Sequence, residues 1–228
     1  MIVVLTAMRS ELRPFVRAAG LTRSDDGAVW SGTVGGHEVV ATTMGVGMAG
    51  AAAAAEQALQ RGDVERLLVV GIAGGIDQDL PIGHVVVPEV VIDGAGGAEH
   101  PTAPWGPVEP DGRLITYHDF QTDPELMARL QREGYAAIDM ETAAVAAVCE
   151  RHGCPHTAFR AISDDALGGT IDPQVAAMAR PDGSPDLGAA VRYVLRRPWR
   201  VPYLVGLGRD SERAARAAAD AAVAALRA

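Results

Sequence analysis

The sequence predicts an α/β fold, with a single domain over residues 1–228 and a central mixed, mainly parallel, twisted sheet flanked by helices. Three observations support this prediction. Strand-like segments alternate with helical segments along the chain, a pattern typical of parallel sheets. The length of 228 residues fits a single core, because single cores grow to roughly 250–300 residues. No internal repeat of roughly 20–50 residues is present, so a repeat architecture is not expected.

Short patterns predict each element in the first half of the chain. A fully apolar segment (residues 2–7) is typical of a core strand, and the amphipathic segment after it (10–19) is typical of a helix. The Gly35-Gly36 pair predicts the turn of a hairpin. The expected elements are strands at 2–7, 28–34, 38–43, 66–70 and 84–92, helices at 10–19 and 49–59, and glycine loops at 45–47 and 71–75.

The second half begins with a segment, residues 94–112, that is rich in Gly, Pro and Ala. We expect a loop there, and a loop of this length in a compact domain is often functional. The remaining expected elements are strands at 113–116 and 157–162, helices at 124–133 and 140–151, and a helical tail from residue 186 that breaks around Pro198 and Pro202 and ends in an alanine-rich helix at 211–228. Alanine-rich faces indicate close helix packing, within the chain or between subunits.

The overall composition is that of a soluble globular protein, with 48% apolar residues and a formal net charge of −9. No apolar run approaches the roughly 20 residues that a membrane span requires, so no span is expected. The first residues show neither a basic leader nor a small-residue cleavage site. We therefore expect a cytoplasmic protein.

Several function classes lack the residues that they need. All twenty basic residues are arginine, and the chain contains neither Lys nor Asn. Without lysine, P-loop phosphate transfer, protein-kinase chemistry and pyridoxal-phosphate Schiff bases are excluded. The acidic balance argues against binding to nucleic acid. Cys149 and Cys154 are too few for a disulfide framework and lack the second pair of a zinc site, so we expect two reduced thiols that mostly pack in the core. We also expect no metal and no organic cofactor.

Ligands of open α/β sheets bind beyond the carboxyl ends of the strands. This rule selects Glu11, the glycine loops that begin at Gly45 and Gly71, the pair Met140-Glu141, and Asp164. Structural explanations exist for each of them. Glu11 and Glu141 fit the first turns of helices, where acids favour the helix dipole, and Asp164 fits a helix N-cap.

The loop Gly45-Val46-Gly47 lacks the third glycine of a dinucleotide fingerprint, which argues against a dinucleotide-dependent oxidoreductase. Its small residues permit close approach of backbone N–H groups to a ribose or a phosphate. Tight helix–strand packing explains the same glycines equally well.

Five motifs stand in a characteristic order along the chain. They are Ala7-Met8-Arg9-Ser10-Glu11, Gly45-Val46-Gly47, Gly71-Ile72-Ala73-Gly74-Gly75, Ile138-Asp139-Met140-Glu141-Thr142-Ala143 and Arg160-Ala161-Ile162-Ser163-Asp164. Together they resemble the nucleoside phosphorylase and nucleosidase superfamily, most nearly its methylthioadenosine/S-adenosylhomocysteine nucleosidase branch. The third motif and the tail at 195–211 also resemble a hopanoid-associated branch, whose members release adenine from adenosylhopane. The resemblance covers most of the chain and implies a homo-oligomer, either a dimer or a hexamer.

The resemblance implies cleavage of the N-glycosidic bond of an adenine nucleoside and a role for each motif residue. Asp164, steadied by Ser163, would protonate the leaving purine, which requires that burial raise its pKa. Glu141 would hold the ribose hydroxyls and stabilise positive charge on the sugar, with Met140 packed against the ribose. Glu11 would position and deprotonate the attacking water. An aspartate at 164 also implies selectivity for adenine over 6-oxopurines.

The nucleophile stays open between water and phosphate. Many relatives carry Ser or Thr where this chain has Ile72, and that hydroxyl helps to hold phosphate or water. Its loss favours hydrolysis, although the amides of Ala73 and Gly74 and the charge of Arg9 or Arg160 could still hold an anion. Phosphorolysis is therefore the alternative reaction, and a nucleoside-binding protein without turnover is the alternative of another class.

The remaining contacts of the substrate are less specific. Phe120 stands near the place where the superfamily has an aromatic residue against the purine, but it could equally be core. His100 and His118 could contact the 5′ substituent or could simply be solvated. The 5′ group itself, whether methylthio, homocysteinyl, hydroxyl or a large lipid, would be handled by residues 94–112 and 172–185. We interpret the apolar patch at 175–178 as an interface.

Overall fold

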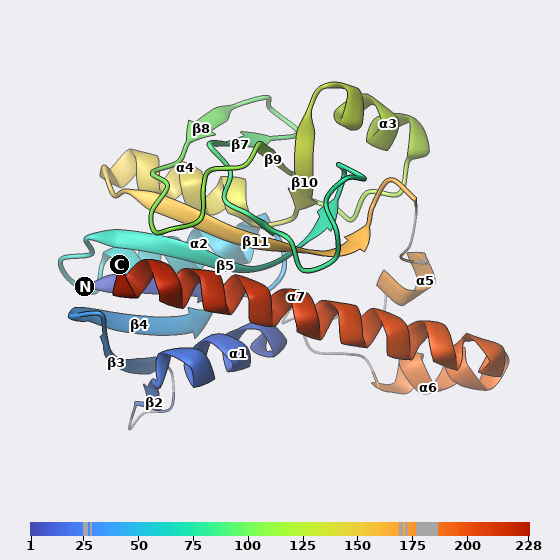
Figure 1. Cartoon of the computed structure of the whole chain (residues 1–228), viewed down its shortest axis with the longest axis horizontal. Helices are drawn as coiled ribbons and strands as arrows, with labels where there is room; N and C mark the ends of the chain where they lie inside the picture. The colour runs from blue at the N-terminus through green and yellow to red at the C-terminus, as the bar shows by residue number, and fades with distance from the viewer. Residues whose placement is uncertain (25–26, 28, 169–170, 172, 177–186) are drawn as a thin grey trace.

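One sheet of eleven strands forms the centre of the molecule (Figure 1). The computed structural model describes residues 1–228 except 25–26, 28, 169–170, 172 and 177–186. Neighbouring strands follow the order β2-β3-β4-β1-β5-β10-β9-β7-β8, and β11 pairs with β5 and β6. The strands are β1 (Ile2–Thr6), β2 (Thr22–Arg23), β3 (Trp30–Val34), β4 (His37–Thr43), β5 (Arg66–Gly75), β6 (Val85–Val86), β7 (Val90–Asp93), β8 (Glu99–Pro101), β9 (Arg113–Thr116), β10 (Tyr135–Asp139) and β11 (His156–Asp165).

Helices cover both faces of this sheet (Figure 1). Strand β1 shows why, because its successive side chains point to opposite faces. Ile2 and Val4 pack with α1 and α7, whereas Val3 and Leu5 pack with α2 and α4. The helices are α1 (Arg9–Ala19), α2 (Met48–Leu59), α3 (Pro124–Arg132), α4 (Thr142–His152), α5 (Pro173–Ala176), α6 (Leu187–Arg196), the 3-10 turn η1 (Pro198–Arg200) and α7 (Val201–Arg227).

The pairing of the strands confirms the predicted mixed, mainly parallel sheet. The long central strands are parallel, since β1 pairs in parallel with β4 and β5, and β11 with β5. Antiparallel pairing joins the hairpins β3–β4 and β7–β8 at the edges, the short β6 to β11, and β10 to the end of β5. Helix α1 follows β1, and helix α2 connects β4 to β5, the two parallel strands that flank β1 in the sheet.

The predicted glycine loop at 71–75 is wrong, because these residues continue β5. The strand pairs with β11 along its whole length and changes its other neighbour, from β1 at Arg66–Val69 to β10 at Gly74 and Gly75. Gly71 has an ordinary negative-φ backbone but no room for a side chain. Glycine in a strand interior often marks such a close approach, and composition alone does not distinguish it from a loop.

Three other expectations in the middle of the chain also need correction. The single strand expected at 84–92 is two strands, because Pro88, which has no N–H to donate to a ladder, separates β6 from β7. Strand β10, which no pattern predicted, occupies residues 135–139, and β8 lies inside the expected loop at 94–112. Strand β11 extends three residues beyond the predicted end, so Asp164 lies within a strand and is not a helix N-cap.

The C-terminal tail is more continuous than predicted. The chain breaks at Pro198, but Pro202 is the second residue of α7, which then runs without interruption to Arg227. A proline is tolerated there because the first amides of a helix have no partner within the helix. The buried alanines of α7 pack against α1 and the sheet of the same chain.

None of the helices that the structure describes combines the length and the apolar content that a bilayer span requires. The expected apolar patch at 175–178 and the segment 172–185 lie largely outside the described residues.

The β3–β4 turn gives a test of how α7 is packed. Gly35 and Gly36 both have positive φ, 57° and 88°, so alanine at either position costs about 1–2 kcal/mol in backbone strain. A Cβ on Gly35 would lie only 1.7 Å from the carbonyl oxygen of Leu226 in α7, whereas a Cβ on Gly36 would meet nothing within 4 Å. We expect Gly35→Ala to lower the free energy of unfolding in urea by about 1–3 kcal/mol more than Gly36→Ala. Equal effects would contradict the packing of α7 against this turn.

Candidate active site

Three buried carboxylates lie at the end of the sheet where the central parallel strands finish. Glu11 is in the first turn of α1, directly after β1, and is 2% exposed. Glu141 is the N-cap residue of α4, directly after β10, and is 4% exposed, and Asp164 lies near the end of β11 and is 5% exposed. Charged groups are rarely buried without partners. The three residues selected from the sequence therefore share one edge of the sheet.

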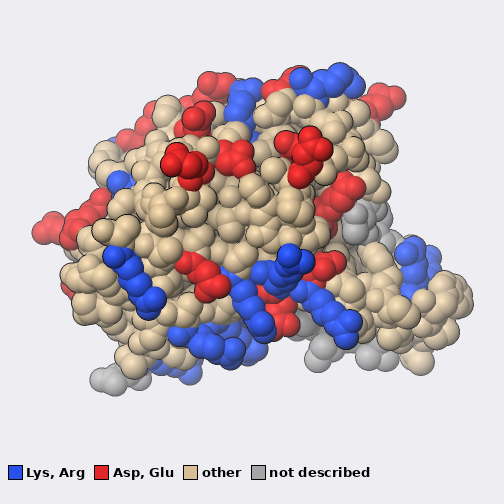
Figure 2. Space-filling view, viewed as in Figure 1, with Lys and Arg blue, Asp and Glu red and all other residues tan. Residues whose placement is uncertain are grey.

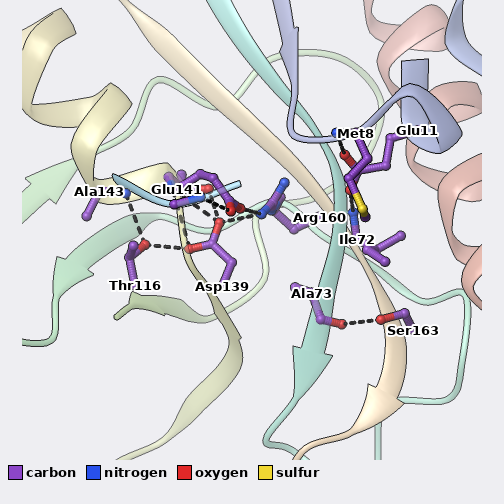
Figure 3. A network of polar contacts seen from close by, with 12 residues as sticks. Met8, Glu11, Ile72, Ala73, Thr116, Asp139, Glu141, Ala143, Arg160 and Ser163 are labelled. Carbon is purple, nitrogen blue, oxygen red and sulfur yellow. Dashed lines mark hydrogen bonds and ion pairs between the residues drawn. The ribbon is translucent and has the colours of Figure 1, made fainter. Parts of the chain in front are cut away.

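Arg160 joins one of these carboxylates, Glu141, to Asp139 at the end of β10 (Figure 3). Its guanidinium Nη2 donates to Oε2 of Glu141 at 2.8 Å and lies 2.7 Å from Oδ2 of Asp139. Burial opposes the charge of this arginine, but the carboxylates of Asp139, Glu141 and Glu11 outweigh burial and raise its pKa. Arg160 is 1% exposed, and its Nε and Nη1 have no hydrogen-bond acceptor among the described residues.

Asp139 holds the other side of this ion pair and was not predicted as a site residue. The hydroxyl of Thr116, at the end of β9, donates to Oδ1 of Asp139 at 2.5 Å, and the hydroxyl and amide of Thr142 donate to the same carboxylate. Thr116 also accepts from the amide of Ala143 at 3.0 Å, which ties the start of α4 to the sheet. The strand-end rule would have found Asp139 if β10 had been recognised, and it could have found Thr116, which ends the strand predicted at 113–116.

Glu11 is held by two backbone amides. Met8 N–H donates to Oε2 at 2.8 Å as part of a capping box, and Ile72 N–H donates to Oε1 at 2.9 Å. At Ile72, β5 no longer pairs with β1 and does not yet pair with β10, so the amide of Ile72 is available to donate to Glu11. Burial raises the pKa of Glu11, while Arg160 and the amides act in the opposite direction.

Gly71 allows Glu11 and Arg160 to face each other. A Cβ on Gly71 would lie 2.4 Å from Oε1 of Glu11 and 2.8 Å from Nη1 of Arg160. The place of a side chain on this glycine is therefore occupied by a carboxylate oxygen and by a guanidinium nitrogen that has no hydrogen-bond acceptor among the described residues. Such a pair can orient a small polar molecule between them.

Glu141 is positioned by Gly47 in the predicted glycine loop. Gly47, at a φ of 96°, donates its amide to Oε1 of Glu141 at 2.9 Å. Gly45 lies in the same connection between β4 and α2, also with a positive φ, but the described contact is made by Gly47. Burial raises the pKa of Glu141, against the attraction of Arg160.

Asp164 lies in a different environment from the other carboxylates. Ser163, its neighbour in β11, donates its hydroxyl to Oδ1 at 2.6 Å and also lies 3.3 Å from the carbonyl oxygen of Ala73. Burial raises the pKa of Asp164 to about 6, although the Ser163 hydrogen bond acts in the opposite direction. The side chain is therefore mostly ionised above that pH and mostly protonated below it.

A small cavity of about 60 Å³ adjoins Asp164. Met140, Phe120 and Gly74 line it together with Asp164 and Asp139, so it connects the acid to the Arg160 network. Phe120 is 41% exposed, which excludes its interpretation as core. The arrangement thus combines an acid, an aromatic ring and a thioether around one hollow.

The other predicted contact residues differ in their surroundings. His100 is in β8 and lies 2.7 Å, through Nδ1, from the Glu150 carboxylate near the far end of α4. Arg9 is exposed at the start of α1 and lines an outer groove with Arg13 and Arg17. His118 is exposed close to Phe120 in the chain. Over the described residues, no cluster of His, Cys, Asp and Glu has an arrangement that could hold a metal ion.

Comparisons with known proteins agree with this architecture. Residues 1–134 and 106–180 match the sequence profile of the phosphorylase superfamily. The 5′-methylthioadenosine/S-adenosylhomocysteine nucleosidase of Bacillus cytotoxicus is 29% identical over 196 residues, which cover 72% of this chain and 85% of that protein.

Solved structures share the fold over nearly the whole chain. The nucleosidase of the same name from Neisseria meningitidis, in complex with methylthio-immucillin-A, has a TM-score of 0.74 at 17% identity and covers 99% of this chain and 98% of that one. Futalosine hydrolase of Helicobacter pylori has a TM-score of 0.68 at 18% identity, covering 96% and 93% of the two chains.

The raised pKa of Asp164 predicts a stability effect with a definite sign. An acid whose pKa rises on folding, here from 3.8 to about 6, stabilises the fold below its unfolded pKa, and this stabilisation is lost as pH rises through about 6. Asp164→Asn keeps an acceptor for Ser163 and removes the charge. We expect it to raise the free energy of unfolding by about 1–3 kcal/mol at pH 8 and to have little effect near pH 4.

The control is Asp79→Asn, an exposed aspartate in the turn that follows β5, because Asp165 itself contributes to the raised pKa of Asp164. Denaturant unfolding of both variants across this pH range measures the effect. A difference between Asp164→Asn and wild type that does not change with pH would contradict the raised pKa.

Proposed function

The chain belongs to the phosphorylase superfamily, and on this premise we propose that it hydrolyses the N-glycosidic bond of an adenine nucleoside and releases adenine. The observation that carries the proposal is the presence of two buried carboxyl groups with different surroundings at the same end of the sheet. Asp164 has a raised pKa, and Glu11 lies beside Arg160 next to Gly71. Cleavage of this bond needs both: a proton for the departing purine and a base for the attacking water. The relative from Bacillus cytotoxicus described above is named as a nucleosidase of two 5′-substituted adenosines, which agrees with this reaction.

Asp164 acts as the general acid in this proposal. A purine that leaves as an anion is a poor leaving group, and a proton delivered to its N7 makes it a neutral one. A pKa of about 6 places the acid close to neutral pH, where proton transfer is most effective. Phe120 and Met140 line the same cavity and give the base and the ribose apolar surfaces to pack on.

Glu141 and its neighbours stabilise the sugar. As the bond to the base lengthens, positive charge develops on the ribose ring, and a nearby carboxylate lowers the energy of that state. Arg160 and Gly47 fix the two oxygens of Glu141 before the substrate arrives, so little reorganisation is needed during the reaction. The second lone pair on each oxygen remains available for the ribose hydroxyls.

Glu11 acts as the general base. Its Oε1 accepts from Ile72 N–H and faces Nη1 of Arg160, so a water beside Gly71 can donate to the carboxylate and accept from the guanidinium. These two fixed groups orient the lone pairs of the water oxygen. The proton that the water loses goes to Glu11, and the sugar carbon receives the hydroxyl.

The charges around this position favour water over phosphate. Arg160 is already paired with Asp139 and Glu141, so it offers no uncompensated positive charge to a dianion. Phosphate would also lie among three carboxylates, at a cost in repulsion that neutral water avoids. The hydrophobic side chain of Ile72 supplies no hydroxyl to hold it.

The first test is release of adenine from adenosine, methylthioadenosine and S-adenosylhomocysteine, with inosine as the 6-oxopurine comparison, each with and without phosphate. We expect release of adenine without phosphate and little release of hypoxanthine. Both Asp164→Asn and Glu11→Gln are expected to lower kcat by about 10²–10⁴, the usual contribution of a general acid or base. Asp79→Asn is the control and is expected to retain activity.

Each other result corresponds to a different function. A strict requirement for phosphate would replace hydrolysis by phosphorolysis. Tight binding of the nucleosides without release of a base, measured by calorimetry, would indicate a binding protein. Unchanged activity in Asp164→Asn would exclude Asp164 as the general acid.

Gly71 provides a second test that changes no catalytic group. The Cβ of Gly71→Ala would displace the Glu11 carboxylate and the Arg160 guanidinium, since it would lie within 3 Å of both. A displacement of about 1 Å can cost 10²-fold in rate, so we expect at least about a 100-fold loss in kcat/KM with the fold retained, as judged by circular dichroism. The control is Gly208→Ala in α7, where a Cβ meets nothing within 4 Å. Full activity of Gly71→Ala would be inconsistent with the proposed position of the water.

A further inference from the structure

Exposed apolar side chains gather at one end of the molecule. Among the described residues, the large hydrophobic side chains with high exposure are Phe120, at the candidate active site, and four others. Those four are Leu195 at 78%, Trp199 at 71%, Val201 at 40% and Val205 at 46%. All four lie where α6, η1 and the start of α7 meet. We call residues 187–209 the α6–α7 corner.

This corner stands clear of the core. The buried residues of α7 begin only at Ala214, so the preceding turns of the helix do not cover the sheet. In Figure 1 the corner extends beyond the sheet at the end toward which the arrowheads of β4 and β11 point. A tryptophan that is 71% exposed at such a position contributes little to the stability of the fold.

The corner is basic, whereas the remaining chain is acidic. Residues 187–209 contain five arginines and no Asp or Glu, although the whole chain has 29 acidic and 20 basic residues. Arg192, Arg196 and Arg209 are exposed. Arg197 lies 5.3 Å from the ring centre of Tyr193, and Arg200 lies 5.0 Å from that of Tyr203. Figure 2 shows this end of the molecule as mostly uncharged surface with basic and no acidic side chains in view.

A tryptophan and aliphatic side chains surrounded by arginines, without any acid, match the chemistry of the water–bilayer interface. Tryptophan and tyrosine rings are enriched at the headgroup level, and arginines pair with anionic headgroups while their stems lie along apolar surface. A helix with such a surface lies on the membrane and does not cross it. We propose that the α6–α7 corner docks the protein on the surface of a bilayer that contains anionic lipids.

The charge pattern favours a bilayer over a second copy of the same corner. A two-fold symmetric contact would bring the same patch of both subunits together and place arginines against arginines. Residues 187–209 contain no acid, and the acids that follow in α7 begin at Asp210. An anionic lipid surface attracts the exposed arginines, Arg192, Arg196 and Arg209, in place of this repulsion.

Vesicle binding of the full chain tests the proposal. Wild-type protein is incubated with vesicles of phosphatidylcholine alone or of phosphatidylcholine and phosphatidylglycerol in equal amounts, and the bound fraction is measured by flotation. We expect binding to the anionic vesicles only, and weaker binding at high salt. Arg192→Gln with Arg196→Gln is expected to weaken partitioning about 25-fold, since each arginine contributes about fivefold. The matched control is Arg129→Gln with Arg132→Gln, two exposed arginines on α3, with binding unchanged.

Tryptophan fluorescence gives an independent readout. The chain contains three tryptophans, Trp30, Trp105 and Trp199, and only the last is strongly exposed. Anionic vesicles are expected to shift the wild-type emission to the blue, and Trp199→Phe is expected to lose that shift while it retains adenine release from soluble nucleosides. Trp199→Ala is expected to reduce the bound fraction.

Three results would overturn the proposal. The first is absence of binding to the anionic vesicles, and the second is binding that the Arg192/Arg196 and Trp199 variants share equally with wild type. The third is a lower oligomer mass of Trp199→Ala by light scattering, which would assign the corner to a contact between subunits. None of these readouts depends on the nucleosidase reaction.

Discussion

The site depends on one buried positive charge. Removing the guanidinium of Arg160 from water costs several kcal/mol, and only partners with good geometry compensate that cost. Asp139 and Glu141 provide them, and the threonines around Asp139 complete its hydrogen bonds. The positive charge of Arg160 in turn offsets the repulsion among the carboxylates of Asp139, Glu141 and Glu11. Strand β11, helix α4 and the end of β10 are therefore held in register by the same interaction that organises the candidate active site.

The change of neighbours along β5 creates room for this chemistry. A strand with partners on both sides throughout would have used every amide in its ladders. Because β5 stops pairing with β1 before it pairs with β10, the amide of Ile72 is available to Glu11, and the preceding Gly71 leaves room for the Glu11 carboxylate and the Arg160 guanidinium. This irregularity of the sheet thus accommodates buried charged groups. The register of the β5–β11 pairing also shifts between Ile162 and Asp164, so that Asp164 lies opposite Gly74.

Sequence reasoning found the parts of the site that follow strand ends, and it failed where the local pattern was ambiguous. Glu11, Glu141 and Asp164 were found because each follows or ends an apolar segment near a helix start. Asp139 was overlooked because Tyr135–Asp139 is short and alanine-rich and has no strand-like alternation. The run 71–75 looked like a loop because glycine has the same local signature in a loop and in a crowded strand. The contacts between distant residues could be identified only from the fold. No pattern in the sequence predicts that Arg160 contacts Asp139 and Glu141, or that Gly47, and not Gly45, donates to Glu141.

The wide separation of the contacting residues along the chain has a consequence for folding. The bond between Ile72 and Glu11 joins residues 61 positions apart, and the bond between Gly47 and Glu141 joins residues 94 positions apart. Contacts of such separation form late, because a long loop must close before they stabilise anything. During synthesis, the N-terminal strands and α1 emerge while Arg160 has not yet been made, so Glu11 remains without the charge that it faces in the finished protein. The candidate active site is therefore complete only once β11 has paired with β5.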